Sequence, residues 1–398
     1  MYNEEMKKLG MNGSAIRELF EYGKIRKKEI GEDNVFDFSI GNPSVPAPSI
    51  VNESLIKILT EMDSVKLHGY SSAIGDYSVR CEIAEYLNKT YRCNEVPELI
   101  QLTVGAASCL VATFKALFNP GDELIVNAPF WPEYQTLFSN TQGKMVIVPT
   151  DDNFNLDLNK IKETINEKTK AIIINSPNNP TGVLYKEETI KELANILNEA
   201  NKKYNKKIFL ISDEAYRELL YTDDDYPFVT NFYDNSIVCY SFSKSISLPG
   251  ERIGYVLVSN KCSIKSDIYN AIKGASRMLG NVCAPTLFQF LVPHCLGYTS
   301  DLAIYNKNRN MLYEMLTNIG YEVVYPDGAF YLFVKSLEKD AKAFSDNAKK
   351  YELLLVASDS FGCEGYVRIS YCVKTDMIEK SKQAFVKLYN DYHGDKNE

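Results

Sequence analysis

Between residues 99 and 258, short apolar segments alternate with longer segments whose apolar positions recur every three or four residues. The apolar segments are 99–104, 123–130, 144–150, 171–177, 208–214, 236–242 and 254–259. Several are apolar at consecutive positions, which is typical of strands covered by helices on both faces. The helical pattern is clearest in 186–204, with Ile190, Leu193 and Leu197 on one face. The alternation predicts an α/β domain with a mostly parallel, seven-stranded sheet flanked by helices.

The pattern changes after residue 288. Segment 306–320 is predicted to be a helix that ends at Gly320. Three strand-like segments follow it, at 321–326, 328–335 and 365–373. A chain of 398 residues is also long for a single core. We therefore expect a large domain over 46–288 and a smaller α+β domain built from the two chain ends, 1–45 and 289–398.

Composition narrows the class of protein. The net charge of −8 argues against nucleic acid or an anionic membrane as the main partner. Nine cysteines occur without any C-x-x-C pair, which favours reduced thiols in a cytoplasmic protein, and the three histidines are not spaced as metal ligands, so no metal is expected. The first ten residues lack an apolar signal region, and no apolar run is long enough to cross a membrane.

Polar and reactive side chains follow several predicted strands where each strand ends. In chain order these are the small residues from Gly105 to Ser108, then Trp131, Asn179, Asp213 with Tyr216, and Lys244. Ligands of an open parallel sheet bind outside the carboxyl ends of its strands. Small residues that begin a helix can hold a phosphate, an aspartate can pair with a ring nitrogen, and a lysine can capture an aldehyde. The set suits a flat, anionic, nitrogen-containing cofactor.

Segment 241–255, SFSKSISLPGERIGY, resembles the lysine motif of the class I/II aminotransferases of fold type I, the aspartate aminotransferase-like enzymes that use pyridoxal 5'-phosphate. SPNNPTG at 176–182 and DEAY at 213–216 are similar to two further signatures of that family, in the same order. Four more similar segments are 38–48, 68–80, 326–333 and 365–370. Seven matches in register cover nearly the whole chain and make the resemblance specific.

The resemblance implies a role for each matching residue around the cofactor ring. Lys244 would hold pyridoxal phosphate as a Schiff base and move the proton of the substrate α-carbon. Asp213 would pair with the ring nitrogen, and Tyr216 and Asn179 would bond the phenolate oxygen. Trp131, the only tryptophan, would stack on the ring.

Further roles are implied for the phosphate and for the substrate. The phosphate ligands would be Ser241, Ser243, Arg252, the backbone at Ala106 and Ala107, and Tyr70 of a neighbouring subunit. That last contact implies a homodimer with shared active sites. Arg368 would bind the substrate α-carboxylate through two parallel hydrogen bonds, with Asn179 and the backbone of Gly41 beside it. Gly250 is expected to provide the turn that points Arg252 back towards the phosphate.

The implied reaction moves an amino group from an L-amino acid to a 2-oxo acid in two half-reactions, with ping-pong kinetics. A carbon–sulfur β-lyase or another eliminating enzyme of the same fold is the alternative, and a non-catalytic cofactor-sensing module is a remote one. One bacterial branch of aspartate aminotransferases has a side-chain-binding lysine where this chain has Ala107. Arg17 or Arg277 could take its place, and aspartate, aromatic, alanine-type and branched substrates all remain open.

Overall fold

Seven strands form the central sheet, as predicted, in a computed structural model that describes residues 2–11, 13 and 15–394. Their spatial order is β2 (Ile100–Thr103), β8 (Gly254–Val258), β7 (Ser236–Ser241), β6 (Phe209–Asp213), β5 (Thr169–Asn175), β3 (Glu123–Ala128) and β4 (Lys144–Pro149). All neighbouring pairs run parallel except those made by β8, which is antiparallel to both β2 and β7. The expected α/β class is confirmed.

Helices cover both faces of this sheet, which explains why its strands are apolar at consecutive positions. In β5, Ile172 and Ile174 lie in one core with Leu193 of helix α9 (Glu187–Tyr204). Ile173, between them, lies in a second core with Phe114 of α6 (Gly105–Leu117). Successive strand residues thus point into different cores, and neither face is left to water.

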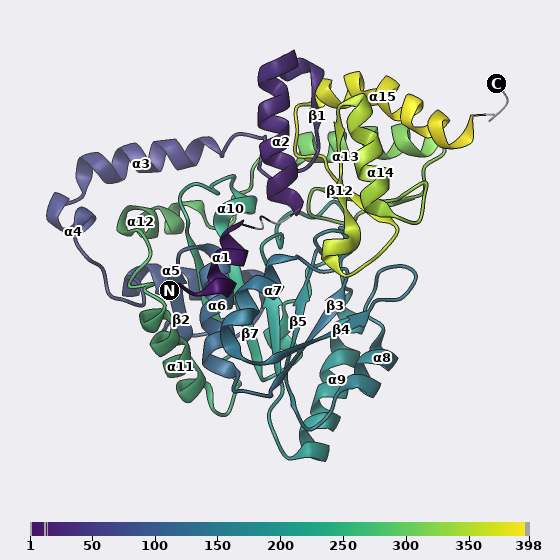
Figure 1. Cartoon of the computed structure of the whole chain (residues 1–398). Helices are drawn as coiled ribbons and strands as arrows, with labels where there is room; N and C mark the ends of the chain where they lie inside the picture. The colour runs from purple at the N-terminus through teal and green to yellow at the C-terminus, as the bar shows by residue number, and fades with distance from the viewer. Residues whose placement is uncertain (1, 12, 14, 395–398) are drawn as a thin grey trace.

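The remaining helices follow the same division. The first core also receives side chains from α3 (Ser49–Glu61), α4 (Ser64–His68), α5 (Tyr77–Tyr91), α8 (Leu158–Thr164), α10 (Phe242–Ser245) and α12 (Thr286–Cys295). The second receives side chains from α7 (Glu133–Phe138) and α11 (Lys265–Met278). Figure 1 shows α6 and α9 packed around the strands, with α3 and α4 projecting as an arm from the body.

The two ends of the chain meet in a smaller unit with its own core. Its antiparallel sheet has the order β12 (Val356–Ala357), β13 (Tyr366–Ser370), β10 (Tyr331–Lys335) and β9 (Val323–Val324). Its helices are α13 (Leu302–Ile319), α14 (Ala341–Ala348) and α15 (Thr375–His393). The N-terminal helices α1 (Glu4–Met11) and α2 (Ala15–Ile30) precede β1 (Phe36–Asp37), which pairs with β11 (Leu353–Leu354).

Helix α2 lies beside the C-terminal elements although it belongs to the N-terminal part of the chain (Figure 1). An ion pair of 2.6 Å between Arg26 and Glu352 links them, and Leu19 of α2 packs with Val356 of β12. Helix α13 ends at Gly320 as predicted, where φ is +121° and glycine is favoured. Residue 288, the expected end of the large domain, lies inside α12, so this boundary stays a prediction.

The parallel direction of the strands gathers their carboxyl ends at one edge. Strands β5, β6 and β7 end there at Asn175, Asp213 and Ser241. Because β8 is antiparallel, its first residue, Gly254, pairs with Ser241 at that same edge, and Arg252 lies just before it. The topology therefore brings together the segments that were predicted to carry the chemistry.

Candidate active site

One cavity of about 310 Å³ is lined by every predicted site residue except Tyr70. These residues are Gly41, Ala106, Ala107, Trp131, Asn179, Asp213, Tyr216, Ser241, Ser243, Lys244, Arg252 and Arg368. They come from the N-terminal segment, from the carboxyl edge of the large sheet and from β13 of the small sheet. The cavity therefore lies where the two sheets and the two chain ends meet.

Lys244 lies in α10, a single turn of helix that begins directly after β7. The Ser241 side chain starts this turn, since its Oγ accepts a 3.2 Å hydrogen bond from the Ser243 backbone N–H. The Lys244 amine donates to the Gly41 carbonyl oxygen at 2.5 Å. Burial, together with the charges of Arg368 and Arg252, lowers the pKa of Lys244 to about 8. An amine with this pKa is partly neutral, and hence nucleophilic, near neutral pH.

Asp213 is buried at the end of β6. Its Oδ2 accepts a 2.6 Å hydrogen bond from the Tyr134 hydroxyl, but its Oδ1 has no partner among the described residues. Burial raises the pKa of Asp213 to about 6, and the hydrogen bond from Tyr134 opposes that rise. A buried carboxylate oxygen without a partner is unfavourable, so a cationic N–H group beside it would be strongly bound.

The opposite end of the cavity suits an anion. Helix α6 begins at Gly105 without a side-chain cap, so the first N–H groups, which include those of Ala106 and Ala107, have no side chain bonded to them. Gly105 has φ of +75°, and a Cβ there would lie only 2.7 Å from Nη2 of Arg252. Arg252 donates to the Ser243 hydroxyl at 3.2 Å and to the Pro249 carbonyl at 2.9 Å. Backbone dipole, guanidinium and hydroxyl thus converge on one end of the cavity.

Arg368 comes from the small sheet and is also buried. Its Nη1 donates to the Asn179 side-chain oxygen at 3.1 Å, and its Nη2 donates to the Ser39 carbonyl at 2.6 Å. Its Nε has no partner among the residues that the structure describes. The guanidinium lies over the Tyr331 ring, 4.4 Å from its centroid, which fixes the plane of the fork. A carboxylate could accept a hydrogen bond from this Nε–H group of Arg368.

The sequence reasoning missed six lining residues, which are Ile16, Ile40, Asn175, Ala215, Pro249 and Tyr331. Tyr331 meets the Tyr216 hydroxyl at 3.0 Å, and its own hydroxyl would lie 1.9 Å from a Cβ at position 41, so only glycine fits there. Asn175 accepts from the Asn179 backbone N–H and donates to the Asp213 carbonyl. Signals existed for both, because Tyr331 lies in the quoted segment 326–333 and Asn175 ends a predicted strand. Ile16 had no such signal.

Two other expectations have different outcomes. Tyr70 is 95% exposed and does not line this cavity, so within one chain it is separate from the other site residues. Gly250 was expected to provide the turn before Arg252: it lies in a bend but has no positive φ, whereas Arg252 itself adopts the left-handed conformation, with φ of +52°. The strained backbone therefore lies at the cationic residue, as is common at functional sites.

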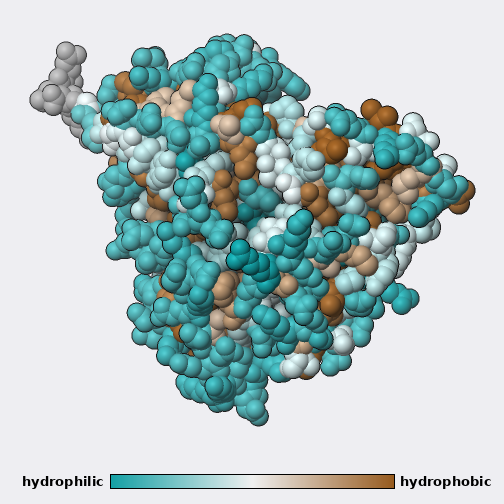
Figure 2. Space-filling model, turned by 180° about the vertical axis from the view of Figure 1, so that it is seen from behind, coloured by the Kyte–Doolittle hydropathy of each residue, from teal (hydrophilic) through white to brown (hydrophobic). Residues whose placement is uncertain are grey.

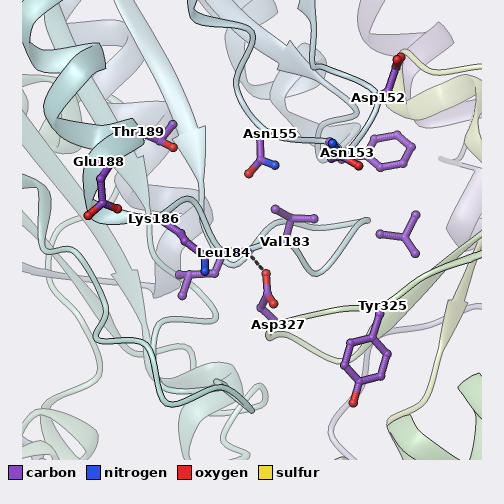
Figure 3. Close-up of a pocket in the computed structure, with 12 residues that line it drawn as sticks. Asp152, Asn153, Asn155, Val183, Leu184, Lys186, Glu188, Thr189, Tyr325 and Asp327 are labelled. Carbon is purple, nitrogen blue, oxygen red and sulfur yellow. Dashed lines mark hydrogen bonds between the residues drawn. The ribbon is translucent and has the colours of Figure 1, made fainter.

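A more open hollow of about 570 Å³ lies elsewhere on the molecule, and Figure 3 shows its walls. Its residues come from the loop at 152–155, from 183–189 and from 324–327, and none of them is a predicted site residue. Asp327 accepts a 3.1 Å hydrogen bond from the Leu184 backbone N–H, drawn as a dashed line in Figure 3. This contact joins a large-sheet loop to the small sheet, and we interpret the hollow as part of that junction.

The cavity, in contrast, fits pyridoxal phosphate on the structure's own evidence. Asp213 presents a buried oxygen without a partner for a ring nitrogen, and Arg252 with the α6 terminus presents donors for a phosphate. Trp131 lines the wall with a half-buried indole.

Within the described ranges, no His, Cys, Asp and Glu side chains are grouped so as to hold a metal ion. No helix in the described part of the chain is long and apolar enough to cross a membrane.

Comparisons with known proteins agree with this geometry. The family model "Aminotransferase class I and II" matches residues 33–385. A probable aspartate aminotransferase of Methanocaldococcus jannaschii is 33% identical over 382 residues, 92% of this chain and 95% of that protein. An aspartate aminotransferase of Thermotoga maritima is 31% identical over 88% of this chain and 90% of its own length.

Solved structures give the same result. The crystal structure of an aminotransferase from Eubacterium rectale has 51% identity and a TM-score of 0.96, and the match covers 98% of this chain and 99% of that one. Aspartate aminotransferase from Thermotoga maritima matches with a TM-score of 0.85 and 28% identity, over 98% of this chain and 100% of that one. By sequence, by fold and by length, this chain belongs to the class I and II aminotransferases.

Proposed function

We propose that this enzyme, an aminotransferase, binds pyridoxal 5'-phosphate in the 310 Å³ cavity and uses it to move an amino group from an L-amino acid to a 2-oxo acid. The observation that carries the proposal is the convergence of three features on one cavity. These are the Lys244 amine with its lowered pKa, the Asp213 oxygen that has no partner among the residues described, and the uncapped start of α6 beside Arg252.

The residues of this chain would hold the cofactor at both ends. Arg252, Ser243 and the first N–H groups of α6 would bind its phosphate, with Ser241 supporting Ser243 through a 2.8 Å hydrogen bond. Asp213 would hold its ring nitrogen in the protonated state. Trp131 would cover the ring, while Tyr216 and Asn179 would hydrogen-bond its phenolate oxygen. When bound, the cofactor supplies an electron sink for the α-carbon of an amino acid.

Lys244 would carry out the acid–base work. Its amine would hold the cofactor at rest and, once released, would take and return the proton at the substrate α-carbon. The lowered pKa suits both tasks, because a neutral amine can accept a proton at physiological pH. Arg368 would bind the α-carboxylate and so orient the α-carbon towards Lys244, with the Gly41 backbone alongside. Because the nitrogen stays on the enzyme between substrates, we expect ping-pong kinetics.

The relatives reported above are all named aminotransferases, so the eliminating and the sensing alternatives are not favoured. An assay with and without an added 2-oxo acid separates the three functions. A transaminase forms a 2-oxo acid from the donor, beyond one equivalent, only when an acceptor is present. An eliminating enzyme releases ammonia without an acceptor, and a sensing module turns nothing over.

We also propose a cytoplasmic homodimer with shared sites. Figure 2 shows apolar side chains at the upper right, over the arm of α3 and α4, where Ile56, Leu59 and Val65 are 65%, 53% and 81% exposed. Such a patch on a projecting arm favours association with a second copy. The phenol of Tyr70, which follows α4, would then bind the phosphate of the neighbouring subunit. The nine free cysteines favour a reducing compartment.

The domain division completes the proposal. The large domain would span 46–288 and the small domain would combine 1–45 with 289–398. Most residues of the two cores around the large sheet fall within 46–288, and most residues of the core of the small unit fall outside that range. The exceptions are Leu291, Val292, Cys295 and Phe333 in the first core, and Tyr216 and Leu219 in the core of the small unit.

One experiment tests the cofactor and its attachment together. The purified protein should absorb visible light, and borohydride should remove the band and fix a pyridoxyl group on the peptide that contains Lys244. Lys244→Ala should abolish both. A pyridoxyl group on another lysine would reject Lys244 as the attachment point.

A further inference from the structure

Part of the cavity wall has no role in holding the cofactor or the α-carboxylate, and this part is apolar. Ile16, from the first turn of α2, and Ile40, directly before Gly41, both line the cavity. Both are half-buried in the isolated chain. Pro249 belongs to the phosphate end, since its carbonyl accepts from Arg252, and the Tyr331 hydroxyl already meets Tyr216. Asn175 is bonded to Asp213 and Asn179, and Ala215 is small, so the two isoleucines are the large apolar side chains left to contact the substrate side chain.

Every cation that lines the cavity already has an assigned task. Lys244, Arg252 and Arg368 are the only basic residues among the described lining residues. Arg17, next to Ile16, lines a different hollow, where the other charged lining residues are Glu133 and Asp359. Arg277 lies in the last turn of α11 and does not line the cavity.

A side-chain carboxylate placed against Ile16 and Ile40 would lose its water without gaining a partner. An aliphatic side chain placed there would gain free energy from the apolar area that it buries. We propose that this aminotransferase selects amino acids with an apolar side chain, of leucine type or larger, and discriminates against aspartate and glutamate. The inference rests on the proposed function, because it takes the positions of cofactor and α-carboxylate from it.

Three donors of nearly equal shape provide the test, since leucine, asparagine and aspartate branch at the same carbon. The holoenzyme is mixed with each donor alone, and the loss of the cofactor's visible band and the 2-oxo acid formed are measured. Leucine should react with a kcat/KM at least about tenfold above that of aspartate, with asparagine between them. Methionine and phenylalanine report how far the apolar wall extends.

Binding provides a readout that does not depend on turnover. Calorimetry with the holoenzyme should give tighter binding for 4-methylpentanoate, the leucine skeleton without its amine, than for succinate, the matching skeleton of aspartate. Faster reaction of aspartate together with tighter binding of succinate would overturn the inference, including through a cation supplied by a second subunit, and would leave the proposed function intact. If no donor of any class loses its nitrogen, the proposed function fails instead.

Variants test the assigned wall. Ile16→Arg should shift the ratio of kcat/KM for aspartate over leucine upwards by at least about tenfold, because it adds the missing partner. Ile40→Lys is the second variant, and it should act in the same direction if Ile16→Arg does not fold. Arg17→Ala is the matched control, and it should leave the ratio unchanged. A ratio that stays constant in both folded wall variants would show that the side chain lies elsewhere.

Discussion

The Tyr134 hydroxyl donates a 2.6 Å hydrogen bond to one oxygen of Asp213, and the other oxygen of that carboxyl group has no partner in the described part of the chain. Both side chains are buried. The arrangement holds the carboxyl group in one orientation and leaves one oxygen for a ring nitrogen. It also moderates a pKa that burial raises to about 6.

Replacing Asp213 should therefore damage catalysis more than folding. Asp213→Asn removes the negative charge that keeps a ring nitrogen protonated, and we expect kcat to fall by about 10²–10³-fold. Tyr134→Phe should have a smaller effect, below about tenfold, and should move the acidic limb of the pH–rate profile to higher pH. The shift follows because Asp213 loses the hydrogen bond that lowers its pKa. Steady-state kinetics from pH 5 to pH 9 measure both effects, and an unmoved acidic limb would contradict the link.

The buried Lys244 amine should make the cofactor-free protein less stable at neutral pH. Its folded pKa of about 8 lies below the value of 10.5 for an ordinary lysine, so between these pH values the folded protein binds fewer protons than the unfolded chain. Stability therefore rises with pH across this window. Lys244→Met should stabilise the cofactor-free protein by about 1–3 kcal/mol at pH 7, and the gain should disappear near pH 10.5. Urea unfolding at both pH values gives the two free energies, and an equal gain at both would refute the assignment.

Arg368 should act on substrate binding and not on cofactor binding. Its guanidinium Nε has no partner in the described ranges of the chain, and Arg368→Lys removes the fork while keeping the charge. We expect kcat/KM to fall by about 10²–10³-fold, with cofactor affinity unchanged. Arg309→Lys is the matched control, because Arg309 is also buried and lies over tyrosine rings but does not line the cavity. Loss of the cofactor in Arg368→Lys would reject its role in substrate binding.

Tyr70 can be placed by complementation between inactive subunits. If it acts across the interface, a hybrid of Tyr70→Ala and Lys244→Ala subunits has one site with both defects and one intact site. Mixing and refolding the two variants should then restore up to about a quarter of wild-type activity, since half of randomly mixed dimers are hybrids and each has one working site. If Tyr70 acts within its own chain, every site carries a defect and activity is not restored. Light scattering of the wild type checks the dimer itself.

Arg217 should be important for stability although it does not line the cavity. It is 2% exposed, and it pairs with Glu214 at 2.9 Å and with Glu218 at 3.0 Å. Arg217→Met leaves the buried Glu214 and the half-buried Glu218 without their cation, which should cost about 3–5 kcal/mol at pH 8. The loss should shrink below pH 7, because burial already raises the pKa of Glu214 to about 7. Adding Glu214→Gln and Glu218→Gln should recover much of the stability, and failure to do so would implicate packing instead.

The sheet and most of the cavity could be predicted from the sequence because their signals are local. Each of the seven strands is a short apolar run, and each predicted run became a strand of the large sheet. The site residues follow those runs, so the topology alone brings Asp213 and Lys244 together. Short strands were missed, since β1, β11 and β12 have only two residues each and carry no periodic signal.

The contacts that the sequence could not reveal join distant parts of the chain. Tyr134 reaches Asp213 across 79 positions, and Tyr331 meets Tyr216 across 115 positions. Ile16 lines the cavity because α2 packs beside β12, which no pattern in the first thirty residues indicates. The left-handed backbone of Arg252 is likewise a tertiary effect, since the nearby Gly250 offered the cheaper local solution.

The hydrogen bond from Arg368 to Ser39 spans 329 positions. Because of this separation, the two residues are synthesised at different times. A ribosome adds about 5–20 residues per second, so the large sheet is complete several seconds before β13 emerges. During that interval the growing chain has the residues proposed to hold the cofactor but lacks Arg368, the residue proposed to bind the substrate carboxylate. The order of synthesis therefore places Lys244 and Asp213 in the chain before Arg368, so the proposed cofactor residues are made before the proposed substrate anchor.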